Sequence, residues 1–207
     1  MVTRFTSTGL IALAVGLTAL AQPAPAVGRV RHGSLGAGQC ASLGEARLCI
    51  GDSYWATLTV AGREVDFTAG GKVAELPDLS VPYEMELDGD RYRVKVEDWS
   101  TARVEFARYS EIRFRKRGSR FELTGYTAKG FGTDCELGMD YSGDLDFVTG
   151  RQVADVDGHR LFTGPTIPIG LRTPNLFSFK EEQLYRPYKL YDGLAEATKT
   201  YCERQDG

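Results

Sequence analysis

Histidine is scarce in this chain, and its scarcity limits the chemistry that the protein can perform. Among the 207 residues only His32 and His159 are histidines. A Ser-His-Asp triad would have to be built around His159, and the sequence contains no G-x-S-x-G turn to present a serine nucleophile. A zinc site is disfavoured too, because no C-x₂-C pair accompanies the two histidines.

A surplus of positive charge is also lacking. The formal net charge is −3, from 25 lysines and arginines against 28 aspartates and glutamates. Proteins that bind nucleic acid need a basic surplus to engage the phosphates, so this composition argues against nucleic acid as a partner. No motif for a cofactor is present, and we expect none to be bound.

No hydrophobic run is long enough to predict a membrane-spanning helix. The apolar run from Leu10 to Leu20 is about half of the ~20 residues that such a helix needs. Arg4 precedes it and small residues follow it, which is typical of a secretory signal peptide. We predict a signal peptide over residues 1–26, cleaved after Ala26, with Ala21 as the other candidate. The protein is then periplasmic or secreted, with no transmembrane segment after cleavage.

Residues 27–39 are rich in glycine, arginine and serine and show no periodicity, so we expect a flexible N-terminal segment. Residues 40–207 have a length typical of a single domain, which we expect to be rich in β-structure and stabilised by disulfides.

Apolar and polar residues alternate with a period of two through most of that domain. Tyr83, Met85 and Leu87 are answered across Asp88-Gly89-Asp90 by a second alternating run, which is a strong hairpin signal. The stretch 103–157 predicts four or five further strands. We therefore expect a mainly β, antiparallel barrel or twisted sandwich, and we favour the barrel because closure removes strand edges. One or two short helices are expected near the C-terminus, over 179–185 and 193–202.

The four cysteines all lie outside the predicted signal peptide, and an even number in an exported chain indicates disulfides. Three connectivities are possible. We favour Cys40 with Cys49, a short loop that a hairpin could close, and Cys135 with Cys202, which would attach the C-terminal segment to the central sheet.

Two strings in the central stretch, Phe121-Glu122-Leu123-Thr124-Gly125-Tyr126 and the segment 144–151, resemble a pattern in an uncharacterised group of exported bacterial proteins. Members of that group carry strands of the forms F-x-L-x-G-Y and N-x-L-T-G. The match spans about thirty residues and departs from the pattern at Thr127 and Asp146. The resemblance implies a secreted or periplasmic β-rich protein with no assigned activity.

A basic group forms the first candidate binding site. It consists of Arg113, Arg115, Lys116, Arg117 and Arg120, which straddle a predicted hairpin turn. Such a positive patch could bind an acidic protein or an anionic envelope polymer. The alternative is that these charges protect an exposed strand from edge pairing.

Acidic residues form the second candidate site. Asp144 and Asp146, two positions apart, should face the same side of a strand, where paired carboxylates could hydrolyse a glycan. Together with Asp140 they could also bind Ca²⁺, although the order of an EF-hand loop is missing. Solvated acidic side chains with no such role are the alternative.

The sequence as a whole favours an exported, non-enzymatic module of the bacterial envelope or exterior that binds another macromolecule. The competing hypothesis is a carboxylate-dependent glycan hydrolase.

Overall fold

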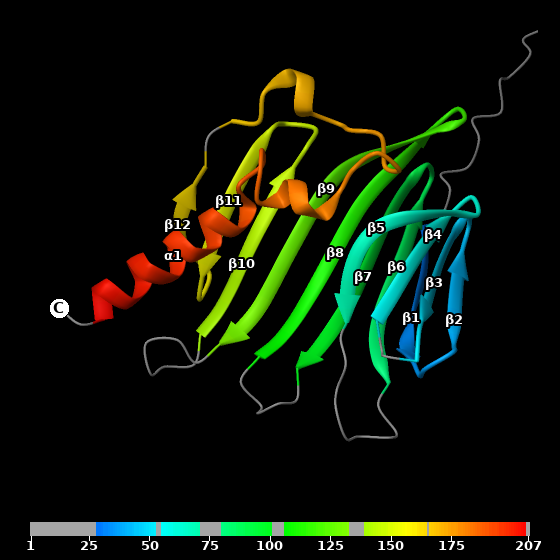
Figure 1. The fold of residues 1–207 in the computed structure, drawn as a ribbon, viewed down its shortest axis with the longest axis horizontal. Coiled ribbons are helices and arrows are strands. Elements are labelled where there is room, and N and C mark those ends of the chain that lie inside the picture. The colour runs from blue at the N-terminus through cyan, green and yellow to red at the C-terminus, as the bar shows by residue number, and fades with distance from the viewer. Residues whose placement is uncertain are drawn as a thin grey trace, which may run out of the picture.

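The computed structural model describes residues 28–52, 55–70, 80–100, 106–132, 139–164 and 166–205, which form two antiparallel β-sheets and a C-terminal helix (Figure 1). The larger sheet contains, in spatial order, β1 (Arg29–Leu35), β6 (Val81–Asp88), β7 (Arg91–Ser100), β8 (Phe106–Arg117), β9 (Arg120–Gly132), β10 (Met139–Asp146), β11 (Arg151–Val156) and β12 (His159–Thr163). The smaller sheet contains β2 (Cys40–Leu43), β3 (Ala46–Ile50), β4 (Trp55–Val60) and β5 (Arg63–Gly70). Two 3₁₀ turns, η2 (Ile169–Leu171) and η3 (Glu181–Leu184), precede the helix α1 (Leu190–Gln205).

The smaller sheet lies on one face of the larger sheet, and the C-terminal segment (residues 166–205, with η2, η3 and α1) lies on the same face (Figure 1). Because side chains alternate along a strand, every second residue of each sheet points into the space between the two sheets. Met85, Val94 and Ile112 of the larger sheet are buried there with Leu48 and Leu58 of the smaller one. The predicted mainly β fold is confirmed, and of its two forms the structure is the twisted sandwich.

The preference for a closed barrel was wrong, because the larger sheet stays open, with β1 and β12 as its two outer strands. Helix α1 packs along β10, β11 and β12 at one edge. At the other edge β1 lies beside β2, where Arg31 Nη1 donates to the backbone oxygen of Ser42 at 3.1 Å.

Two expected features of the chain differ in detail. Residues 29–35, within the segment expected to be flexible, form β1 and pair with β6 along its full length. In place of the helix expected over 179–185 there is a single 3₁₀ turn, η3, and the helix expected over 193–202 is α1, which begins three residues earlier and ends three residues later. The Asp-Gly hairpin between β6 and β7 is confirmed, with Gly89 at a φ of 59°.

The first predicted disulfide, Cys40–Cys49, is present and joins directly opposite residues of β2 and β3. Cys202 on α1 is also disulfide-bonded. Its predicted partner, Cys135, lies outside the described residues, so that pairing stays a prediction.

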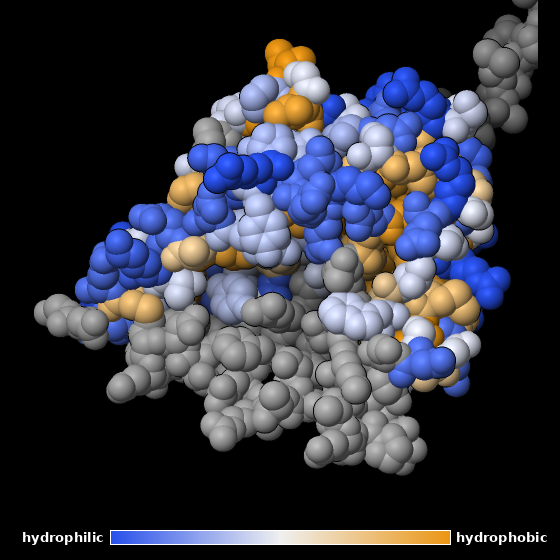
Figure 2. All heavy atoms as spheres, in the orientation of Figure 1, coloured by the Kyte–Doolittle hydropathy of each residue, from blue (hydrophilic) through white to orange (hydrophobic). Residues whose placement is uncertain are grey.

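Figure 2 shows the side of the molecule on which α1 and the smaller sheet lie. Hydrophilic residues dominate over α1 and the C-terminal segment, and a hydrophobic tip lies at the top of the view at η2, where Ile169 is 82% exposed. Among the described residues, no helix has both the length and the apolar character needed to cross a membrane.

Helix α1 is attached to the sheet by close packing and by a hydrogen bond from Tyr201. Gly143 of β10 lies under the helix, and a Cβ there would come within 2.7 Å of Leu190. Tyr201 donates its hydroxyl to Asp157 Oδ2 at 2.6 Å, and the other oxygen of Asp157 accepts from the amide of Asp140 at 2.8 Å. These bonds from Tyr201 and Asp140 lower the pKa of Asp157, although it is exposed.

The attachment of α1 through Asp157 should therefore depend on pH. Because the pKa is lower in the folded state than in the unfolded chain, the carboxylate stabilises the fold above the unfolded value of about 3.9, and this contribution disappears as the pH falls through the folded value. We expect Asp157→Asn to reduce the free energy of unfolding at neutral pH and to have no effect at the acid end of the titration. Asparagine suits this position because the φ of Asp157 is 48°.

Urea unfolding of both proteins across the acid range measures this difference. A destabilisation that persists unchanged below the unfolded pKa of about 3.9 would contradict the role of the ionised carboxylate.

Candidate functional site

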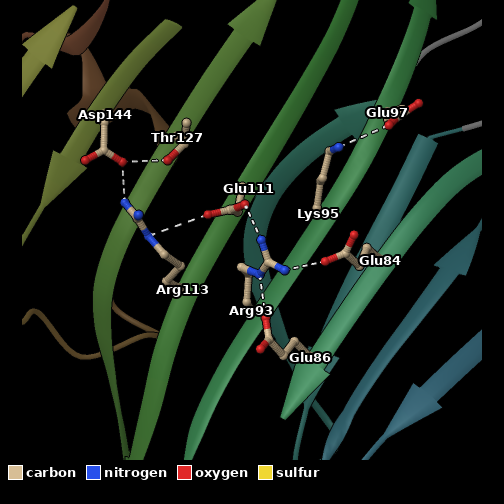
Figure 3. A network of polar contacts seen from close by, with 9 residues as sticks. All are labelled: Glu84, Glu86, Arg93, Lys95, Glu97, Glu111, Arg113, Thr127 and Asp144. Atoms are coloured by element: carbon tan, nitrogen blue, oxygen red, sulfur yellow. Dashed lines mark hydrogen bonds and ion pairs between the residues drawn. The ribbon is translucent and has the colours of Figure 1, made fainter. Parts of the chain in front are cut away.

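The face of the larger sheet opposite the smaller sheet carries a row of charged side chains, at the alternate positions of β6 to β10 that point away from the core. Figure 3 shows that most of them form ion pairs from one strand to the next, while Lys95 and Glu97 pair along β7. The residues drawn there are Glu84, Glu86, Arg93, Lys95, Glu97, Glu111, Arg113, Thr127 and Asp144. We call this surface the open face.

Arg93 of β7 is the first centre of this row. Its Nε donates to Glu86 at 2.8 Å, another of its nitrogens pairs with Glu84, and a third lies 3.6 Å from Glu111. Burial alone would lower the pKa of Arg93, but the charges of Glu111, Glu84 and Glu86 outweigh it and raise the pKa. The guanidinium is thus held between carboxylates from β6 and β8.

Arg113 of β8 is the second centre, and a glycine gives it room. It reaches across β9 to pair with Asp144 of β10 and donates to the backbone oxygen of Leu145 at 3.1 Å (Figure 3). A Cβ at Gly125, its cross-strand neighbour, would collide with the guanidinium. The glycine of the F-x-L-x-G-Y string therefore leaves space for the arginine to lie over β9, and Thr127 completes the contact by donating to Asp144 at 2.6 Å.

Like charges face each other directly across β7 and β8. The register pairs Arg91 with Arg115 and Arg93 with Arg113. Side chains opposite each other in an antiparallel pair are close neighbours, so two such arginine pairs oppose folding unless carboxylates offset them. Glu111 lies 3.6 Å from Arg93 and 3.7 Å from Arg113, and it is only 8% exposed.

These arginines border a groove of about 450 Å³, which is within the range of ligand-binding pockets. Four cations line it, Arg91, Arg93, Arg113 and Arg115, together with three carboxylates, Glu86, Asp88 and Asp146. Thr124, Val148 and Thr149 lie at its side toward β9 and the β10–β11 turn, and Val148 is 49% exposed. We call this the arginine groove.

One end of the arginine groove offers side chains that are not already engaged. Asp88 and Arg91 face each other across the β6–β7 hairpin, and both are exposed. Neither side chain makes an ion pair or hydrogen bond with the part of the chain that the structure describes. Arg115, which lies opposite Arg91, forms an ion pair with Glu122 at 2.9 Å.

The five cations predicted from the sequence do not share one surface. Arg113 and Arg115 lie on the open face, and Arg117 extends their row toward the turn, 3.4 Å from Glu122. The side chain of Lys116 points to the opposite face of the strand, toward the smaller sheet, and pairs with Glu45 of the β2–β3 turn. Arg120 is exposed and has no ion pair within the described residues. Intramolecular carboxylates thus neutralise much of the predicted positive patch.

The acidic pair predicted for hydrolysis does share a face, as expected, since Asp144 and Asp146 pair with Thr127 and Gly125 of β9. Asp144 is engaged by Arg113 and Thr127. Asp146 accepts the amides of the β10–β11 turn. Burial alone would raise its pKa, but hydrogen bonds from Thr149 and Val148 and the charge of Arg113 lower it. A general acid needs a raised pKa, so Asp146 is not arranged to donate a proton.

The three residues considered for Ca²⁺ are spread along β10. At about 3.3 Å per residue, Asp140 lies roughly 13 Å from Asp144 and 20 Å from Asp146, while calcium ligands lie within about 2.6 Å of the ion. Across the described ranges, no group of three or more histidine, cysteine, aspartate or glutamate residues could hold a metal ion.

Sequence reasoning missed Arg91 and Arg93, which supply half of the arginines in the groove. The signal was present, because both occupy the polar positions of the run that follows the Asp-Gly turn. What was missing was the register of β7 against β8, which places them opposite Arg115 and Arg113.

Comparisons with protein-family models, with curated proteins and with solved structures gave no match. The resemblance to exported bacterial proteins therefore stays a prediction.

Proposed function

We propose that this chain is an exported, non-enzymatic protein of the bacterial envelope or exterior, and that it binds an anionic polymer in the arginine groove. The observation that carries the proposal is the pair of like-charged cross-strand contacts, Arg91 with Arg115 and Arg93 with Arg113, around a groove of about 450 Å³. Four guanidinium groups in one groove repel each other, and an anionic ligand relieves that repulsion.

Three features support the export and binding parts of the proposal. The N-terminal sequence has the pattern of a signal peptide. The Cys40–Cys49 disulfide is typical of proteins in oxidising compartments. The arginines are also held in position before a ligand arrives, because Arg93, Arg113 and Arg115 each contact carboxylates of the same sheet, and such preorganisation lowers the cost of binding.

The hydrolase hypothesis has less support. It needs one carboxyl group that stays protonated and one that is ionised, in a cleft. The pKa of Asp146 is lowered, where a general acid needs a raised one, and Asp144 is already engaged by Arg113 and Thr127.

Calorimetric titration with oligogalacturonate, polyphosphate and polyglutamate tests the proposal. The double variant Arg91→Gln and Arg115→Gln should weaken binding of the preferred polymer by more than about tenfold, because each lost charge-assisted hydrogen bond is worth about 1.5–3 kcal/mol. Glutamine at position 115 keeps a donor for Glu122, which limits the damage to the fold.

The matched control is Arg29→Gln with Arg204→Gln, which removes the same charge at exposed sites on β1 and α1. It should retain nearly full affinity. The proposal fails if none of the three polymers binds, or if the control loses as much affinity as the groove variant.

A further inference from the structure

We infer that the ligand of the arginine groove is an acidic glycan, a hydroxyl-rich chain whose units carry an anionic group beside their hydroxyls. This inference rests on the proposed function and names the class of polymer that the groove takes. It follows from the mixed charge of the lining, from the residues at the open end of the groove, and from the lack of exposed aromatic faces in it.

The lining is not uniformly basic. Four arginines share the groove with Glu86, Asp88 and Asp146, which leaves a small positive excess. A chain that carries only phosphates would meet these carboxylates as like charges. Sugar hydroxyls, in contrast, donate hydrogen bonds to carboxylates while an anionic substituent accepts from arginine. The mixed lining therefore fits a ligand with donors and anions side by side.

Asp88 and Arg91 supply that combination at one end of the groove. They lie opposite each other across the hairpin, both are exposed, and the described part of the chain gives neither side chain an ion pair or hydrogen bond. Arg91 can take the anionic group of one sugar unit while Asp88 accepts from a hydroxyl of the same unit or of the next one.

Nucleic acid fits the groove poorly. Single strands are held largely by stacking of bases on aromatic side chains. The two aromatic residues that border the groove, Tyr92 and Phe114, are 7% and 0% exposed, because their rings point into the core and stack on each other there. The groove offers polar contacts and little stacking surface.

An acidic protein also fits poorly. The centre of a protein interface is depleted of charged residues and enriched in aromatic and apolar anchors. In the arginine groove seven lining residues are charged, and Val148 is the one large apolar side chain of its lining that is exposed. A glycan, which presents hydroxyls and anionic groups, meets these side chains without needing an apolar anchor.

The test compares probes that separate hydroxyls from charge. Calorimetry is run with oligogalacturonate, with dextran of matched length, with a phosphodiester-linked glycan, and with polyphosphate and polyglutamate of matched charge. Asp88→Ala removes an acceptor for sugar hydroxyls and, at the same time, a negative charge that repels phosphates, so it should weaken the binding of a glycan but not that of polyphosphate. We expect about five- to tenfold weaker binding of the acidic glycan and unchanged or tighter binding of polyphosphate.

Each outcome decides a point. Binding of oligogalacturonate or of the phosphodiester glycan, weakened by Asp88→Ala, supports the inference, and the stronger of the two identifies the anionic group. If the unchanged protein binds polyphosphate or polyglutamate more tightly than either acidic glycan, the inference is overturned and the proposed function stays in place. If it binds dextran more tightly than any anionic probe, both are overturned. If no probe binds, the proposed function itself fails. Glu64→Ala on β5, exposed and away from the groove, is the control of equal charge.

Discussion

Replacing Phe147 with alanine should lower the free energy of unfolding by about 3–5 kcal/mol, the usual cost of truncating a buried phenylalanine. Phe147 is fully buried where β10 ends. Its ring lies 4.8 Å from that of Tyr188 and 6.0 Å from that of Phe179, both in edge-to-face geometry. The side chain thus joins the sheet to the C-terminal segment, and its loss leaves a cavity between them.

The neighbouring residue provides the control. Val148 is 49% exposed, so Val148→Ala should change the free energy of unfolding by no more than about 0.5 kcal/mol. Denaturant unfolding, followed by circular dichroism, measures both variants on the same scale. If Phe147→Ala costs less than about 1 kcal/mol, the C-terminal segment does not pack on the sheet through this ring.

The sequence was sufficient to predict this packing only in part. The alternation of Leu145 and Phe147 indicates that both side chains face a core, and both are fully buried. That Phe147 meets Tyr188 and Phe179 depends on the path of a segment without periodicity. Contacts of that kind are tertiary, and no local pattern predicts them.

The choice between a barrel and a sandwich illustrates the same limit. Period two fixes which side chains face inward, and the Asp-Gly turn fixes the β6–β7 hairpin. Neither determines whether the outer strands pair with each other or what packs beside them. In this chain α1 packs along β12, and Arg31 reaches from β1 to a backbone oxygen of β2. Both devices come from residues that show no strand signal of their own or were assigned to a flexible segment.

The arginine groove was predictable to a similar degree. The two-residue spacing of Arg113 and Arg115 puts both on one face of a strand, and that face is the open one. Their neighbours Arg91 and Arg93 lie twenty or more residues earlier in the chain, and only the strand register brings the two pairs together. Lys116 was grouped with them because it is adjacent in sequence, whereas the alternation of a strand sends it to the other side.

Replacing Glu111 with glutamine should destabilise the protein by about 1–3 kcal/mol. The carboxylate is nearly buried and lies between two arginines that face each other across β7 and β8. Breaking a fully buried pair costs about 3–5 kcal/mol, but the side chains of Arg93 and Arg113 are 39% and 32% exposed, and solvent screening reduces the effect. Glutamine keeps the shape of the side chain, so the loss reports the charge.

The control for this prediction is Glu97→Gln on β7. It removes a carboxylate that lies 3.1 Å from Lys95 and is more exposed than Glu111. It should cost no more than about 0.5 kcal/mol. The penalty of Glu111→Gln should also shrink as salt is added, because ions screen the repulsion between Arg93 and Arg113. Equal penalties for the two variants, or one that salt leaves unchanged, would show that Glu111 does not act by offsetting the arginine pair.

The same substitution should have the opposite effect on binding. Arg93 and Arg113 both line the arginine groove, and Glu111, which lies next to them but is not among the lining residues, partly neutralises their charge. Removing that carboxylate makes the groove more positive, so we expect Glu111→Gln to bind an anionic polymer more tightly while the fold becomes less stable. Stability and affinity are opposed here because the same arginine charges repel each other in the free protein and attract the anionic ligand.

Calorimetry and denaturant unfolding on one preparation measure both changes. A variant that loses stability and affinity together would indicate that Glu111 positions the arginines for the ligand instead of competing with it.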